Sequence, residues 1–199
     1  ISKTFGSVVA NNHVNFDVHP GEIHCLLGEN GAGKTTLMEC VYGFYHLDSG
    51  EIYFKDKEVV IRSPHEAIRL GIGMVHQHYE LIETHSILEN IILGVEAKGL
   101  LIDEKAAEQR LTDLCGQYQV DLDPHMMVWQ LSVGEKQWVE ILKALYEGVD
   151  LLILDEPTAV LTPQEAESLF ATLREMRERG LSIVLVTHKL NEVLEISDR

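Results

Sequence analysis

A glycine-rich run at residues 28–36 constrains the fold of this chain more than any other feature. It reads Gly-Glu-Asn-Gly-Ala-Gly-Lys-Thr-Thr and fits the pattern G-x-x-x-x-G-K-[ST]. An apolar stretch at residues 23–27 precedes it, and a stretch with helical character at residues 36–42 follows it. This order predicts a buried strand, a tight loop and a helix, which is the context that the pattern requires.

The chemistry of this loop indicates a bound phosphate. Glycines let the backbone turn tightly and direct several N–H groups at one anion, and the helix N-terminus adds positive partial charge. Lys34 is expected to reach the β- and γ-phosphates of a nucleoside triphosphate, and the Thr35 hydroxyl to ligate Mg²⁺. The alternative is a glycine-rich turn that binds nothing. The residues expected at the nucleotide are Gly28, Asn30, Gly31, Ala32, Gly33, Lys34, Thr35 and Thr36.

Further apolar runs predict a mainly parallel sheet. Residues 72–75, 151–154 and 183–186 read as strands, and the last two runs are apolar throughout. Such strands, alternating with helices, are typical of an α/β protein whose parallel sheet is covered on both faces.

Shorter strands are expected in the first third of the chain. Residues 8–10 and 14–18 predict two of them, the second with alternating character. Residues 50–55 and 59–61 flank Asp56-Lys57 and predict a β-hairpin.

Hydroxyl side chains mark three helix starts. Ser63, Ser132 and Thr162 each stand three residues before a glutamate, which is the capping-box pattern. The first of these helices is expected to end near Gly71. From about residue 81 to 146 the pattern is predominantly helical.

The composition limits which binding partners and which cellular compartment are expected for this chain. The net charge is −16, from 32 acidic and 16 basic residues, which argues against a broad nucleic-acid or anionic-lipid surface. The three cysteines show no C-x-x-C spacing, so we expect core thiols and a reducing, cytoplasmic compartment. No run approaches the ~20 apolar residues of a membrane span, so any membrane work would need another chain. The chain has no initiator Met and stops after a helical pattern, which suggests a fragment lacking its C-terminal end.

Two carboxylates end one of the buried strands. Asp155 and Glu156 directly follow residues 151–154. In phosphoryl-transfer sites the first carboxylate of such a pair holds Mg²⁺ and the second orients the attacking water. The alternative is an acidic pair that simply meets solvent. The phosphate-binding loop upstream favours the catalytic interpretation.

Four further features carry a family resemblance. Residues 131–135, Leu-Ser-Val-Gly-Glu, are similar to the LSGGQ signature of ATP-binding cassette proteins, and they also form an ordinary helix cap. Gln77 follows a strand, as in the Q-loop of that family, and His188 follows the last buried strand, as in its switch histidine. Phe5 stands where the family stacks an aromatic ring on adenine, and its alternative is a place in the core.

Over essentially its whole length, the chain therefore resembles the nucleotide-binding domain of ABC transporters. Residues 76–79, 89–91 and 157–162 resemble more particularly the ATPases of simple-sugar and nucleoside importers, which often carry two cassettes in one polypeptide. Within that group this chain resembles the first cassette of a tandem pair.

The resemblance implies a fold and its division. It implies a P-loop NTPase (RecA-like) core with a mainly parallel sheet, an antiparallel β subdomain and a helical subdomain. Residues 1–199 are expected to form one ABC ATPase domain, with the core at 1–80 and 141–199 and the helical subdomain at about 81–140.

The resemblance also implies roles for individual residues. Two cassettes close head to tail on two ATP molecules, so Ser132 and Gly134 would serve the ATP of the facing cassette. Glu156 would act as general base or water-positioning residue, and His188 would contact the γ-phosphate. The expected catalytic residues are Glu156, His188 and Gln77; the expected Mg²⁺ ligands are Thr35, Gln77 and Asp155; Phe5 is expected on the adenine.

The implied cofactors are ATP and Mg²⁺, and the implied partners are proteins rather than nucleic acid. They are a transmembrane ABC permease subunit, a second nucleotide-binding domain that is an identical copy or a fused tandem half, and an extracytoplasmic binding protein. The region from Gln77 through about Leu93 would touch the permease. The domain would lie peripherally on the cytoplasmic face of the cell membrane.

Departures from the family pattern leave two alternatives open. Glu135 stands where many members have Gln, Thr162 where many have Asp, and Trp138 where a basic residue is usual. Trp138 is interpreted as a helix-face aromatic packed on the core. Its presence is the reason for the first alternative, a cassette that binds ATP but barely hydrolyses it. The other alternative is a non-transport cassette. Lys34 and Ser132 are too close in sequence for the long coiled coil of the DNA-repair type, and the ribosomal type should be less acidic.

Overall fold

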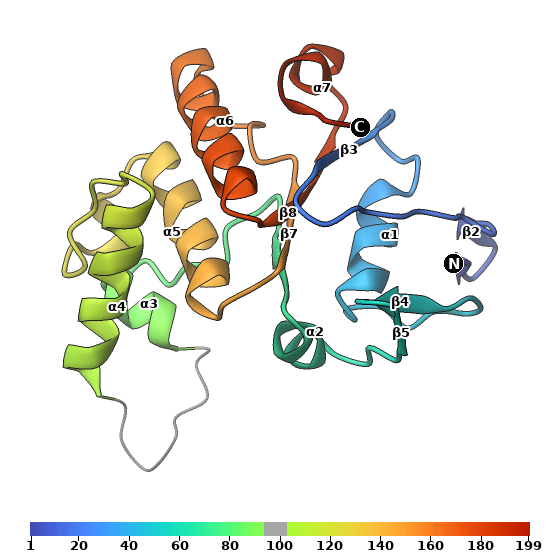
Figure 1. The fold of residues 1–199 in the computed structure, drawn as a ribbon, viewed down its shortest axis with the longest axis horizontal. Coiled ribbons are helices and arrows are strands. Elements are labelled where there is room, and N and C mark those ends of the chain that lie inside the picture. The colour runs from blue at the N-terminus through green and yellow to red at the C-terminus, as the bar shows by residue number, and fades with distance from the viewer. Residues whose placement is uncertain (94–102) are drawn as a thin grey trace.

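A four-stranded parallel sheet forms the centre of the computed structural model, which describes residues 1–93 and 103–199 (Figure 1). The strand order is β3-β8-β7-β6. The strands are β3 (Ile23–Leu27), β6 (Ile72–Val75), β7 (Leu151–Asp155) and β8 (Ser182–Thr187). Each of them lies where an apolar run predicts it, so the mainly parallel α/β class is confirmed.

The carboxyl ends of these four strands share one edge of the sheet. Leu27 is in register with Thr187, and Asp155 is in register with Val186. Val75 is in register with Leu154. Because all pairs are parallel, the segments that follow the four strands leave the sheet side by side, which is where open α/β sheets form their binding crevices.

Helices cover both faces of the sheet. The covering helices are α1 (Lys34–Val41), α2 (Pro64–Leu70), α5 (Val133–Tyr146), α6 (Pro163–Glu178) and α7 (Leu190–Ile196). Strand side chains alternate between two cores. Ile153 and Val184 pack with α1 and α2, whereas Leu152 and Leu185 pack with α5, α6 and α7. A sheet buried on both faces explains why its strands read as continuous apolar runs.

A second group of helices has its own core. It contains α3 (Ile87–Ile92), α4 (Glu104–Gln117) and the short 3-10 helix η1 (Val128–Gln130). Helix α5 belongs to both groups, because Ile141 packs against the sheet while Leu142 packs with α3 and α4. The part of the helical pattern at residues 94–102 lies outside the described residues. In the described ranges, no helix combines the length and the apolar character of a membrane span.

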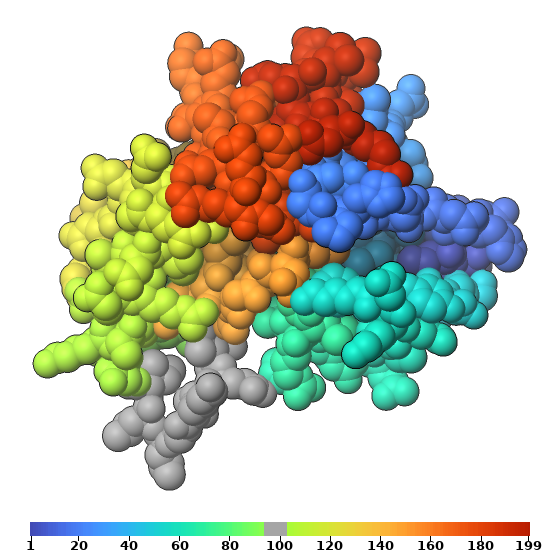
Figure 2. All heavy atoms as spheres, in the orientation of Figure 1, coloured from blue at the N-terminus to red at the C-terminus, as the bar shows by residue number. Residues whose placement is uncertain are grey.

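Two antiparallel strand pairs lie on the other side of the central sheet from α4 (Figure 1), and in Figure 2 their blue and cyan atoms lie to the right, with the yellow-green atoms of α4 to the left. β1 (Lys3–Phe5) pairs with β2 (Val8–Asn11), and β4 (Ile52–Phe54) pairs with β5 (Lys57–Val59). The β4–β5 hairpin is confirmed, but it turns one residue earlier than predicted. Lys55 and Asp56 form the turn with φ of +52° and +60°, because a two-residue hairpin with right-handed twist needs positive φ at both central positions.

The strand predicted at residues 14–18 is wrong. This segment has no strand partner in the described structure. Its alternation has another cause, since Val14, Phe16 and Val18 are partly buried against the core beneath α1. The alternating pattern therefore reports burial of one side and not membership of a sheet.

Helix caps follow the predicted pattern in two of three places. Complete capping boxes begin α5 at Ser132 and α6 at Thr162. At the start of α2, Ser63 accepts from the Glu66 N–H, but the Glu66 carboxylate accepts from the Arg62 N–H at 2.8 Å instead of the Ser63 N–H. Trp138 is partly buried against the sheet core, as predicted.

Candidate functional site

The loop at residues 28–36 has the backbone of an anion-binding concavity. It joins β3 to α1, and Gly31 and Gly33 adopt left-handed φ of +83° and +87°. A Cβ at Gly33 would overlap the carbonyl oxygen of Ala10 in β2, so that position admits no side chain. Left-handed residues at the start of a helix direct successive backbone N–H groups toward one point. Such a concavity suits a phosphate.

Lys34 is held inside this loop. Its ammonium donates to the carbonyl oxygens of Gly28 at 2.8 Å and Glu29 at 2.9 Å. The residue is only 9% exposed although it carries a charge. A buried ammonium held by backbone oxygens is a cation positioned before any ligand arrives.

Asp155 lies at the end of β7 with the properties of a cation ligand. It is 2% exposed, and its Oδ1 has no hydrogen-bond partner among the described residues. Burial raises the pKa of its carboxyl above the ordinary value; a hydrogen bond with Thr35 opposes this rise, and the charge of Glu156 adds to it. A buried carboxylate oxygen without a partner, next to a threonine hydroxyl, is the oxygen donor set that Mg²⁺ prefers.

Glu156 gathers two other predicted residues around its carboxylate. Its Oε1 lies 2.9 Å from Nδ1 of His188, and its Oε2 accepts from the Gln77 amide at 3.4 Å. The side chain is 12% exposed, and its backbone has a left-handed φ of +48°. The three side chains come from the segments after β6, β7 and β8, so the parallel register brings them together. They form a polar cluster that can hold and deprotonate a water molecule.

Three predicted residues lie apart from this cluster. Phe5 in β1 is 41% exposed and packs edge-on against Tyr45, with ring centroids 4.9 Å apart, so it is not a core residue. Ser132 is exposed at the start of α5, where its hydroxyl accepts from the Glu135 N–H at 3.3 Å. Gly134 is buried against Glu165 of α6, whose side chain a Cβ would meet at 2.6 Å. Ser132 therefore lies on a separate surface at the start of α5, and Gly134 is buried in the first turn of the same helix.

Two residues outside the predicted nucleotide and metal sites, His76 and Glu39, interact electrostatically with Asp155. His76 lowers the pKa of Asp155 through its charge, and it acts in the same sense on Glu39 of α1. Burial is the main cause that raises the pKa of Glu39, and the charge of Asp155 adds to it. His76 directly follows β6, so it lies at the carboxyl edge of the sheet, as Asp155 does.

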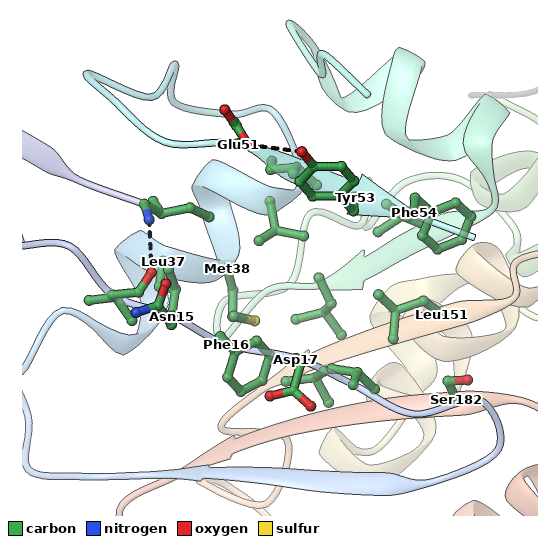
Figure 3. A pocket seen from close by; sticks show the side chains of 18 of the residues that line it. Asn15, Phe16, Asp17, Leu37, Met38, Glu51, Tyr53, Phe54, Leu151 and Ser182 are labelled. Carbon is green, nitrogen blue, oxygen red and sulfur yellow. Dashed lines mark hydrogen bonds between the residues drawn. The ribbon is translucent and has the colours of Figure 1, made fainter. Parts of the chain in front are cut away.

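A cavity of about 990 Å³ lies elsewhere, and no residue of the phosphate-binding loop lines it (Figure 3). Phe16 faces it from one side, Tyr53 and Phe54 from the other, and Met38 of α1 and Leu151 of β7 also line it. The lining mixes apolar side chains with polar ones and contains none of the expected catalytic side chains. The chemistry points to the carboxyl edge of the sheet and not to this cavity.

Replacement of Asp155 by Asn is expected to stabilise the ligand-free protein. Near pH 7 the wild type buries an ionised carboxylate with an unpartnered oxygen, and the amide removes that charge, so we expect a gain of about 1 kcal/mol in unfolding free energy. Because the folded pKa lies above the unfolded one, ionisation costs stability as pH rises between them. The gain should therefore be present at pH 7 and shrink as pH falls toward the ordinary value of 3.8.

Urea unfolding of the ligand-free protein at several pH values measures this gain. Asp121→Asn, at an exposed position, makes the same chemical change without burial and should leave the unfolding free energy within about 0.5 kcal/mol. A loss of stability in Asp155→Asn at pH 7 would show that the carboxylate is stabilised where it lies.

Comparison with known proteins places the chain among ABC proteins. The family model described as ABC transporter matches residues 11–159. The chain is 48% identical over 200 residues to the nucleoside import ATP-binding protein NupA of Lactococcus lactis. It is 40% identical over 199 residues to the galactose/methyl galactoside import ATP-binding protein MglA of Escherichia coli. A crystal structure of a nucleotide-free ATP-binding cassette from an ABC transporter matches with a TM-score of 0.89 at 26% identity, covering 100% of this chain and 83% of that one.

The curated relatives are much longer than this sequence. All of the chain is matched in both, but it spans 40% of the length of NupA and 39% of MglA.

Proposed function

This chain belongs to the ABC transporter family, and we propose that it is an ATP-binding and ATP-hydrolysing domain that powers uptake of a nucleoside or simple sugar through a separate permease. The observation that carries the ATPase proposal is the Glu156 carboxylate between His188 and Gln77, at the sheet edge from which the phosphate-binding loop also leaves. The nucleoside and galactose importers among its relatives support the transported class.

Binding of the nucleotide rests on the loop and on Lys34. The N–H groups around Gly31 and Gly33 and at the start of α1 donate to the phosphate oxygens. Lys34 exchanges its bonds to the carbonyl oxygens of Gly28 and Glu29 for bonds to the β- and γ-phosphates. Phe5, exposed next to Tyr45, provides a ring face for the adenine.

The donor set near the loop fits Mg²⁺. Asp155 provides a buried carboxylate oxygen without a partner among the described residues, Thr35 a hydroxyl and Gln77 an amide oxygen. When bound, Mg²⁺ neutralises charge that develops on the phosphate oxygens. Asp155 and Thr35 would therefore hold the ion, with Gln77 completing the set.

Hydrolysis rests on Glu156. Its carboxylate orients the attacking water and accepts a proton from it, and Gln77 holds one carboxylate oxygen. His188 holds the other oxygen and reaches toward the γ-phosphate. The Glu156 side chain is 12% exposed and the His188 side chain 39%, so water can reach the pair from the histidine side.

The remaining predicted residues require a second cassette. Ser132 is exposed at the start of α5, so its hydroxyl can meet the ATP of a facing domain, and Gly134, buried against Glu165, would serve that ATP from its place in the first helical turn. We propose a head-to-tail pair in which the second domain is an identical copy or a fused half. Residues 77–93 would contact the permease, and an extracytoplasmic binding protein would deliver the substrate.

This arrangement sets the proposed location and division of the chain. The domain would lie on the cytoplasmic face of the cell membrane and attach to it through the permease. We propose one ATPase domain whose core is at 1–80 and 141–199 and whose helical subdomain lies near 81–140.

The proposal is tested by ATP hydrolysis measured against protein concentration, with and without Mg²⁺. Turnover is expected only with Mg²⁺, and its rate should rise more than linearly with protein concentration, because two domains share each site. Asp155→Asn should lose the Mg²⁺ dependence of ATP binding. ATP binding without turnover, even with a permease present, would instead support a cassette that has lost hydrolysis.

A further inference from the structure

A polar cluster, buried except for its lysine, lies next to the segments that carry the Glu156–His188 pair. We define it as Thr158, Thr187, Lys189 and Glu192, and call it the Glu192 cluster. Thr158, Thr187 and Glu192 are 3%, 2% and 8% exposed. No part of the nucleotide site described above uses these side chains.

The Glu192 carboxylate is satisfied on both oxygens. Its Oε2 accepts from the Thr187 hydroxyl at 2.8 Å, and its Oε1 accepts from the Thr158 hydroxyl. Lys189 Nζ lies 2.9 Å from Oε1 and also donates to the Thr158 carbonyl oxygen at 3.2 Å. One side chain of α7 therefore ties the end of β8 to the turn that follows β7.

These two tethered segments carry the catalytic pair. Thr187 directly precedes His188, and Thr158 follows Glu156 by two residues. Glu156 has a left-handed backbone, which a non-glycine residue keeps only when surrounding contacts hold it. Its N–H donates to the Val186 carbonyl oxygen at 2.9 Å, so the pair is held from the β8 side as well.

We propose that Glu192 is a positioning residue for ATP hydrolysis, whose carboxylate holds the Glu156 and His188 segments at the separation where their side chains meet. This inference rests on the proposed function. The Glu192 side chain is 11% exposed and the Lys189 side chain 41%, so the carboxylate bears the desolvation cost that an apolar side chain of the same volume avoids. The contribution of the charged cluster is positional. Each of its hydrogen bonds fixes the position of one segment relative to α7.

Steady-state kinetics of Glu192→Gln tests the role. The amide keeps the shape but has only one acceptor oxygen, and Lys189 loses its ion partner. We expect kcat to fall about 10- to 100-fold, while KM and the Kd of ATP change less than about twofold. Glu195→Gln makes the same change at an exposed position of α7 and should keep kcat within about twofold. The proposal would be overturned if Glu192→Gln and Glu195→Gln had equal kcat. It would also be overturned if Glu192→Gln lost kcat/KM through a higher KM alone.

A double-mutant cycle separates positioning from general support of the fold. In a His188→Ala background, Glu192→Gln should lower the residual single-turnover rate by less than about threefold, because its partner in catalysis is gone. The same fold-loss in both backgrounds would overturn the proposal. If Glu192→Gln does not fold, Thr187→Val removes one hydroxyl at constant volume. It should lower kcat in the same way, and Thr187→Ser should restore it.

The failure of this inference is distinguishable from failure of the proposed function. If the wild type does not hydrolyse ATP, the function proposed above fails. The positioning role is then tested by a measurement that needs no turnover. The ring resonances of His188 in an NMR spectrum should shift in Glu192→Gln and stay in place in Glu195→Gln. Unshifted His188 resonances in Glu192→Gln would refute the positioning role.

Discussion

Glu156→Gln is expected to lower the rate of ATP hydrolysis by about 100-fold or more, with ATP binding close to that of the wild type. The amide fills the same space and still accepts a hydrogen bond from His188 or Gln77, so the cluster stays assembled. It cannot accept a proton from water. The loss should therefore fall on kcat, which is where removal of a group needed only in the transition state appears.

Single-turnover hydrolysis and equilibrium ATP binding, measured on the same samples, separate these effects. Glu167→Gln, on the exposed side of α6, makes the same change in charge and should hydrolyse ATP like the wild type. A Glu156→Gln protein that keeps wild-type turnover would remove Glu156 from the reaction. A protein that loses ATP binding instead would place Glu156 among the binding residues.

Lys34→Ala is expected to weaken ATP binding by about 100-fold. Removing one partner of a buried, charge-assisted contact costs about 2–5 kcal/mol, and each 1.4 kcal/mol is a factor of about ten in Kd. The estimate applies here because the ammonium is buried inside the loop and already fixed by two carbonyl oxygens. The variant therefore loses a positioned charge and not a flexible surface lysine.

Binding of a fluorescent ATP analogue, titrated with and without Mg²⁺, measures the change in Kd. Lys57→Ala, at an exposed position of β5, is the matched control and should keep the wild-type Kd. Thermal unfolding of the ligand-free variants checks that the loop still folds. An unchanged Kd in a folded Lys34→Ala protein would exclude this lysine from the phosphate site.

Local features of the fold were predictable because their causes lie within a few residues. The inner strands β7 and β8 are buried and apolar on both faces, so each appears as a short continuous run. The phosphate-binding loop needs left-handed glycines at Gly31 and Gly33, and a glycine pattern records that need directly. Helix starts at Ser132 and Thr162 were predictable for the same reason, since a cap and its partner stand three residues apart.

Predictions failed or fell short where a strand needs a partner. The segment at 14–18 alternates because one side is buried, and nothing in that pattern says whether another strand lies beside it. The hairpin moved by one residue because its turn is chosen by positive φ at Lys55 and Asp56, neither of which is a glycine. Both outcomes depend on neighbours that the local pattern does not contain.

By itself, the sequence determined which segments become buried strands, where the phosphate-binding loop lies and which carboxylates end a strand. Only the tertiary structure decided that Glu156 meets Gln77 from 79 residues away and His188 from 32 residues away, and that Glu192 ties the segments behind them. Local backbone preference and burial act within a short window of residues. Strand order and register, by contrast, arise from packing both faces of the sheet at once, and they place side chains from distant segments at one edge.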